Sequence, residues 1–122
     1  MIVPKLKIIV AGSRDFTNYS LLNQKLNFYC QRYSPSQIEI ISGAARGADR
    51  LGEKYAQERN WSLKKFPADW DKYGRGAGYR RNEQMAEYAT HAVVFWDGKS
   101  KGSQHMIRIA KEQNLNLRVV RF

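Results

Sequence analysis

The chain has 122 residues, of which 43% are hydrophobic, and a formal net charge of +10 from 21 Lys and Arg against 11 Asp and Glu. This length fits one ordinary domain with a buried core, so we expect a single domain over residues 1–122. The lone cysteine excludes an internal disulfide and a cysteine-rich metal site. The positive charge favours an anionic partner, and nucleic acid, a nucleotide and an acidic protein all satisfy it.

The beginning of the chain, Met1 to Lys5, lacks the charged segment and the long apolar run of a signal peptide. No apolar run approaches the roughly 20 residues of a membrane span, so we expect no membrane partner. Cys30 has no second cysteine to pair with, which fits a reducing compartment and predicts a cytoplasmic protein. Cys30 also falls in an apolar helical pattern, so we expect it to pack in the core.

Strand and helix patterns alternate along the chain. Short β-branched apolar runs predict buried strands, and apolar residues three or four positions apart predict helices. In chain order we expect a strand at 7–11, a helix at 22–33, a strand at 38–41, a helix at 48–60, a strand at 62–66, a long loop at 67–78, a helix at 79–89, a strand at 92–96, a helix at 103–110 and a strand at 117–122.

This alternation defines the α/β class. Right-handed crossovers turn it into a Rossmann-like three-layer α/β/α fold with a five-stranded, mainly parallel sheet in the order 3-2-1-4-5. Ligands of such sheets bind beyond the carboxyl ends of the strands, where the winding reverses. We expect that point between the first and fourth strands.

The segments after the first and fourth strands carry residues suited to an anion. After the first strand, Gly12 allows a tight turn, Ser13 offers a hydroxyl and Arg14 offers a bidentate cation for phosphate. An ordinary turn with a solvated arginine is the alternative. The segment after the fourth strand leads into a helix start, and its candidate ligand-binding residues are Gly98, Ser100, Gly102 and Ser103.

The segment after the second strand surrounds a helix start with small residues, which leaves room for an anion above the helix N-terminus. Its spacing matches neither a Walker A loop nor the dinucleotide fingerprint. Its candidate ligand-binding residues are Ser42, Gly43, Arg46, Gly47 and Asp49. Close packing of the helix on the sheet is the alternative, with Asp49 as a partner for an arginine.

The long loop after the third strand, and the helix start behind it, are dense in Trp, Tyr, Gly and Arg, and long loops are often functional. The candidate ligand-binding residues here are Asp69, Trp70, Arg81 and Asn82. Trp70 or a neighbouring tyrosine could stack on a base. Arg81 lies on the helix face turned to the sheet and needs a partner, either a ligand phosphate or Asp69 in a purely structural pair.

We predict no metal site and no cofactor, because His91 and His105 lack Cys or His neighbours at metal-ligand spacing. His91 should open the fourth strand, and His105 should lie on a helix surface. No Ser-His-Asp order is readable, so no catalytic residue is assigned.

Taken together, these segments resemble the SLOG superfamily over roughly residues 7–122. The run Ser42-Gly43-x-Ala45-Arg46-Gly47-x-Asp49, with Val10 to Arg14 before it, is similar to the nucleotide-fold core of Smf/DprA DNA-processing proteins. The stretches from Pro67 to Met85 and from Trp96 to Ser103 resemble small YspA/YpsA-type SLOG proteins. The resemblance implies a Rossmann-like domain that binds nucleotides or nucleotide-derived molecules, often as a homo-oligomer.

The resemblance extends to phosphoribohydrolases of the LOG, lysine-decarboxylase-like type, which release bases from nucleoside monophosphates. Those enzymes carry a Gly-Gly-x-Gly-Thr-x-x-Glu motif and an Arg-Lys pair; Arg81 matches the Arg, and Asn82 replaces the Lys. Gly102 and Ser103 match the Gly-Thr, but Met106 stands in place of the Glu. The acid that would stabilise an oxocarbenium-like centre is missing at that position.

Three functions stay open on the sequence. The first is binding or sensing of a nucleotide or nucleotide-derived phosphate ligand. The second is hydrolysis of nucleoside monophosphates at the N-glycosidic bond, with Glu83 or Asp97 as an alternative acid. The third is binding of single-stranded nucleic acid, which the DNA-processing relatives perform and which the aromatic residues and positive charge fit.

Overall fold

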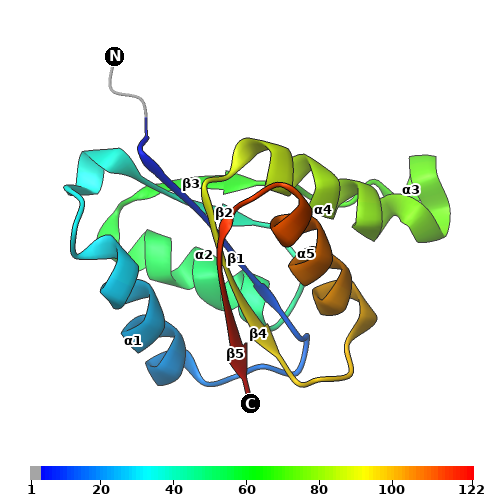
Figure 1. Ribbon diagram of the computed structural model, residues 1–122, viewed down its shortest axis with the longest axis horizontal. Helices are drawn as coiled ribbons and strands as arrows, with labels where there is room; N and C mark the ends of the chain where they lie inside the picture. Colours follow the sequence, from blue (N-terminus) through cyan, green and yellow to red (C-terminus); the bar gives the residue numbers. More distant parts are fainter. Residues whose placement is uncertain (1–3) are drawn as a thin grey trace.

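The computed structural model describes residues 4–122 as a five-stranded sheet between layers of helices (Figure 1). In chain order the elements are β1 (Leu6–Gly12), α1 (Tyr19–Cys30), η1 (Pro35–Gln37), β2 (Ile38–Ser42), α2 (Ala48–Arg59), β3 (Ser62–Lys65), α3 (Trp70–Tyr73), η2 (Gly74–Gly76), α4 (Ala77–Tyr88), β4 (His91–Trp96), α5 (Lys101–Glu112) and β5 (Asn116–Arg121). The strands run in parallel in the order β3-β2-β1-β4-β5. The expected fold class and strand order are both confirmed.

β1 lies at the centre of the sheet, where it pairs with β2 on one side and β4 on the other. In this register Gly12, the last residue of β1, lies opposite Phe95, next to the end of β4. The direction of winding reverses here, because the chain proceeds from β1 to β2 toward one edge of the sheet and from β4 to β5 toward the other. The loops that follow β1 and β4 therefore meet at the same edge of the sheet.

Alternate residues of β1 face different layers. Ile8 and Val10 pack in a core that includes residues of α1 and α2. Ile9 and Ala11 pack in a second core with residues of α4 and α5. Both sides of the central strand are thus buried, which explains its nearly continuous run of apolar residues. Cys30 is buried in the first core, as expected.

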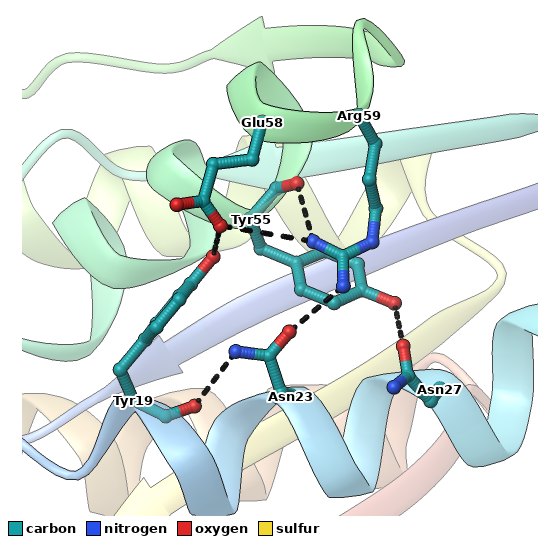
Figure 2. A network of polar contacts seen from close by, with 6 residues as sticks. All are labelled: Tyr19, Asn23, Asn27, Tyr55, Glu58 and Arg59. Carbon is teal, nitrogen blue, oxygen red and sulfur yellow. Dashed lines mark hydrogen bonds and ion pairs between the residues drawn. The ribbon is translucent and has the colours of Figure 1, made fainter.

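A polar network joins α1 to α2 (Figure 2) and contains Tyr19, Asn23, Asn27, Tyr55, Glu58 and Arg59. The Arg59 guanidinium lies 3.7 Å from the centroid of the Tyr55 ring and donates to the backbone oxygen of Tyr55 and to Asn23 Oδ1. The buried Tyr55 hydroxyl donates to Asn27 Oδ1 at 2.6 Å. These contacts fix α1 against α2, so the loops that enter the two helices start from one packed layer.

Several expected boundaries were wrong, and two of these errors involve a capping side chain. Residues 67–78 are not a plain loop but contain α3 and η2, because the Asp69 carboxylate caps α3 by accepting from the Lys72 N–H at 3.1 Å. α1 begins earlier than expected because Asn18 Oδ1 accepts from the Leu21 N–H at 3.0 Å. Over residues 4–122, no helix is long and apolar enough to cross a bilayer.

Candidate functional site

A pocket of about 460 Å³ lies beyond the carboxyl ends of β1 and β4. Its volume falls within the roughly 300–1,000 Å³ of small-molecule sites. The residues that line it are Ala11, Gly12, Ser13, Arg14, Asp15, Ala45, Arg46, Asp49, Arg81, Asn82, Met85, Asp97, Lys99, Ser100, Gly102, Ser103 and Met106. They come from all four segments that the sequence singled out, so segments far apart in the chain meet at the expected edge of the sheet.

Most of the candidate ligand-binding residues line this pocket, namely Gly12, Ser13, Arg14, Arg46, Asp49, Arg81, Asn82, Ser100, Gly102 and Ser103. Gly43 and Trp70 line a neighbouring cavity instead, and Asp69 lines a third. Ser42, Gly47 and Gly98 are not among the residues that line any of these cavities.

The turn after β1 is shaped by its contact with β4. Gly12 has a φ of +154°, and a Cβ there would collide with the backbone oxygen of Phe95. The Ser13 N–H donates to the same oxygen at 2.9 Å, and the buried Ser13 hydroxyl accepts from the Asp97 N–H at 3.2 Å. Gly12 lines the pocket, and its missing side chain also leaves room for the neighbouring strand. Arg14 and Asp15 are both exposed and line the pocket.

The loop between β2 and α2 is held by contacts of Ser42 and Gly47, which do not line the pocket. Gly47 has a φ of +81°, and a Cβ there would lie 2.5 Å from the backbone oxygen of Ser13. The fully buried Ser42 hydroxyl donates to Glu53 Oε2 at 2.7 Å and accepts from the Ala44 N–H at 3.0 Å. Ser42 and Gly47 thus shape the loop, and Arg46 is left exposed at the pocket wall.

Asp49 is a buried carboxylate in the pocket wall, with 5% of its surface exposed. Its Oδ2 accepts from the Ala45 N–H at 3.2 Å. Burial raises the pKa of Asp49 to about 6, and the Ala45 hydrogen bond and the nearby Arg81 charge oppose that rise. Asp49 therefore changes charge close to neutral pH, which is a property found often in functional sites.

Arg81 is held by the protein on two of its three guanidinium nitrogens. One Nη donates to the backbone oxygen of Gly43, and Nε donates to Asn82 Oδ1 at 3.0 Å. Burial lowers the pKa of Arg81, and Asp49 opposes the effect. The purely structural pair with Asp69 is not what the structure shows, because Asp69 caps α3 and Arg81 is bonded to Gly43 and Asn82.

The loop between β4 and α5 forms the opposite wall. Asp97 Oδ1 accepts from the N–H groups of Lys99 and Ser100, both at 2.8 Å, and these bonds lower the pKa of Asp97. The Ser100 hydroxyl accepts from the Ser103 N–H and so caps α5. Gly98 has a φ of +85° and lies against Arg121, which explains its absence from the lining.

Sequence reasoning missed the apolar floor of the pocket, which is formed by Ala11, Met85 and Met106. A signal was present, since Met85 and Met106 each lie three residues after a polar candidate on a helix face that turns to the sheet. Met106 is 1% exposed. Of the two acids considered for hydrolysis, Asp97 lines the pocket, whereas Glu83 is exposed and outside the lining.

A second cavity of about 320 Å³ adjoins the pocket and shares Arg14, Arg46 and Arg81 with it. Its far wall includes Trp70, which is 51% exposed. The three arginines therefore separate a pocket with an apolar floor from a cavity with an exposed aromatic side chain. No group of three or more His, Cys, Asp and Glu within the described part of the chain could hold a metal ion.

The fold and this pocket define a Rossmann-like α/β protein with a polar, mixed-charge site where the sheet reverses its winding. The chain belongs to the YspA, cpYpsA-related SLOG family (YAcAr), whose model matches residues 6–73. It is similar to the Gene 61 protein of Mycobacterium phage D29, with 28% identity over 119 residues covering 89% of this chain and 91% of that protein.

A solved structure of DNA processing protein A from Helicobacter pylori, described for its single-stranded DNA binding mode, has a similar fold with a TM-score of 0.64. The match has 21% sequence identity and covers 95% of this chain but 65% of that protein. At this identity the likeness shows the fold alone. The SLOG resemblance of the sequence is confirmed, including the YspA-type relation.

Proposed function

We propose that this protein binds a nucleotide or nucleotide-derived phosphate ligand in the pocket between β1 and β4. One observation carries the proposal: Arg14, Arg46 and Arg81 come from three separate segments and converge on one pocket. Arginine binds phosphate through paired, charge-assisted hydrogen bonds. A cluster of this kind at the switch point of a parallel sheet suits an anionic ligand.

The rest of the lining supports a nucleotide rather than inorganic phosphate alone. The floor of Ala11, Met85 and Met106 offers apolar surface for a base or sugar. The carboxylates Asp15 and Asp49 offer acceptors for hydroxyl groups. Sites that orient a small molecule typically combine such an apolar surface with a few polar groups.

Calorimetric titration of the folded protein against nucleoside mono- and diphosphates, cyclic nucleotides and ADP-ribose tests this proposal. We expect binding of at least one of them. Arg14→Ala and Arg46→Ala should each weaken it about tenfold to a hundredfold, the range of one hydrogen bond to a charged group. Arg32→Ala removes an equal charge from an exposed position after α1, outside the pocket, and serves as the matched control.

The proposal fails if the folded protein binds none of these compounds. It also fails if Arg32→Ala weakens binding as much as Arg14→Ala, because the arginines would then act only through the net charge. The homo-oligomer that the family resemblance implies, and the cytoplasmic location, stay predictions. Sedimentation velocity and cell fractionation test them.

A second candidate, binding of single-stranded nucleic acid, is favoured by the half-exposed Trp70 beside the three arginines. Bases stack on exposed aromatic side chains while cations contact the backbone phosphates. This candidate predicts that the affinity for a short single strand falls steeply as salt rises, and that Trp70→Ala weakens binding. An affinity that does not change with salt, or no gel shift at low salt, contradicts it.

A further inference from the structure

Asn82 is a buried side-chain amide, 6% exposed, whose oxygen and nitrogen both have partners. Its Oδ1 accepts from Arg81 Nε at 3.0 Å. Its Nδ2 donates to the backbone oxygen of Gly102 at 3.2 Å and lies 3.2 Å from His105 Nδ1. The Arg81 nitrogen can only donate and the Gly102 oxygen can only accept, so the orientation of the amide is fixed from both sides.

This orientation determines the protonation state of His105. Because Asn82 Nδ2 carries only hydrogens toward His105, Nδ1 of His105 has to accept. The imidazole is therefore neutral, with its proton on Nε2. His105 lines a separate surface cavity and not the ligand pocket, and its contact with Asn82 links it to the pocket wall.

We propose that His105 is a positioning residue for the ligand pocket: its unprotonated Nδ1 fixes the Asn82 amide, which in turn fixes the Arg81 guanidinium. The effect on a ligand rests on the proposed function, whereas the effect on Arg81 does not. When His105 is protonated, Nδ1 becomes a donor that opposes Asn82 Nδ2. The amide then loses its hydrogen bond to His105 and is less restrained against rotation, so Arg81 Nε loses an acceptor of fixed orientation.

The surroundings of His105 favour its neutral form at pH 7. From α4, the Tyr79 ring lies with its centroid 4.5 Å from that of the imidazole, and Glu83 faces it. Arg108 and Glu112 approach from α5 itself. Burial and the Arg108 charge lower the pKa of His105, and the two glutamates oppose them. The side chain is half-buried, so protons reach it from solvent.

Nitrogen-15 NMR of the ligand-free protein tests the proposal. At pH 7.5 we expect His105 Nδ1 to carry no proton, and we expect the Arg81 Nε–H signal to shift with pH at the midpoint of the His105 titration. Asp49 also faces Arg81 and titrates near pH 6, so a variant has to separate the two. His105→Asn does so, because its Oδ1 replaces the Nδ1 acceptor and does not titrate.

In His105→Asn, the component of the Arg81 Nε–H shift that titrates with His105 should vanish. In His105→Leu at pH 7.5, the Arg81 Nε–H signal should resemble that of the wild type at low pH. Three results overturn the proposal: a proton on Nδ1 at pH 7.5, an Arg81 signal unchanged in His105→Leu, or a pH response that persists fully in His105→Asn. All three are read without a ligand, so they do not depend on the proposed function.

Binding of ADP-ribose adds a second readout, since its diphosphate does not titrate between pH 5.5 and 7.5. From pH 7.5 to 5.5 the wild-type affinity should fall about tenfold, the size of one hydrogen bond to a charged group. Protonation of Asp49 removes a negative charge beside the ligand, so it acts in the opposite direction. In His105→Asn the affinity should not fall, and an equal fall there contradicts the proposal. Absence of ADP-ribose binding counts against ADP-ribose as the ligand and leaves the outcome of the NMR test unaffected.

Discussion

Asp49 should lower the stability of the folded protein at neutral pH, and Asp49→Asn should relieve that cost. The carboxylate is 5% exposed, and burial raises its pKa to about 6 from an ordinary value of 3.8. The charges of Arg14 and Arg81 favour its ionised form, but burial outweighs them. Asparagine keeps an oxygen that can accept from the Ala45 N–H and carries no charge to bury.

The magnitude follows from the two pKa values of Asp49. The difference between 6 and 3.8 corresponds to about 3 kcal/mol at most. The pKa is raised in the folded state, so folding is favoured below pH 3.8, where both states are protonated, and this advantage is lost as the pH rises to 6. The gain from Asp49→Asn should therefore be about 2 kcal/mol at pH 5 and about 3 kcal/mol at pH 7.5.

Urea unfolding at pH 5, 6 and 7.5 measures this gain as the difference between the free energies of unfolding of the variant and the wild type. Asp15→Asn is the matched control, because Asp15 lines the same pocket but is exposed, and its difference should stay within about 0.5 kcal/mol. If Asp49→Asn destabilises the protein at pH 7.5, or if its effect is the same at all three pH values, the reasoning is refuted.

Three further predictions concern positions whose role is structural. Gly47→Ala should lower the free energy of unfolding by about 3 kcal/mol, because φ is +81° and the new Cβ would lie 2.5 Å from a backbone oxygen. Gly76 has open space around it, so the control Gly76→Ala should lower it by less than about 0.5 kcal/mol in the same urea titration. Tyr55→Phe removes the hydrogen bond to Asn27 and should lower the free energy of unfolding by about 1 kcal/mol, and an unchanged value contradicts the network in Figure 2. Burial raises the pKa of Cys30 to about 11, so a disulfide reagent at pH 8 should label it far more slowly in the native protein than in urea, and equal rates contradict its burial.

The architecture could be predicted from the sequence because its signals are local and agree with one another. The apolar runs in β1 and β4 are short and β-branched, as strands buried on both sides require. Right-handed crossovers then leave few strand orders, and the order with β1 beside β4 is the one observed. The meeting of the four loops follows from that order, without knowledge of any side-chain contact.

The individual roles of loop residues could not be predicted, because each depends on a neighbour that is distant in sequence. Gly12 is required by the backbone of Phe95, and Gly47 by the backbone of Ser13. The Ser42 hydroxyl donates to the carboxylate of Glu53, which follows it by eleven residues. Composition alone suggested that the glycine and serine residues in these loops face a ligand. In the structure, several of them instead allow one loop to pack against its neighbours.

The same packing makes the arginines of the pocket differ in how firmly the protein holds their side chains. Arg81 is bonded on two nitrogens and partly buried, so little conformational entropy is lost when a ligand contacts it. Arg14 and Arg46 are exposed and extend from loops held by backbone contacts. A fixed guanidinium orients a ligand, and exposed ones attract it from solution.

The acids of the pocket can be compared with the roles that glycoside hydrolysis requires. Met106, at the position of the hydrolase glutamate, is buried in the floor and cannot stabilise a positive centre. Asp97 has its pKa lowered by two backbone N–H groups, so it stays ionised and cannot donate a proton at neutral pH. Asp49 has the pKa of a general acid, but one oxygen is bonded to the backbone that shapes the loop. The pocket thus presents three arginines but, with Met106 in place of the glutamate that the hydrolase resemblance implies, no carboxylate at that position.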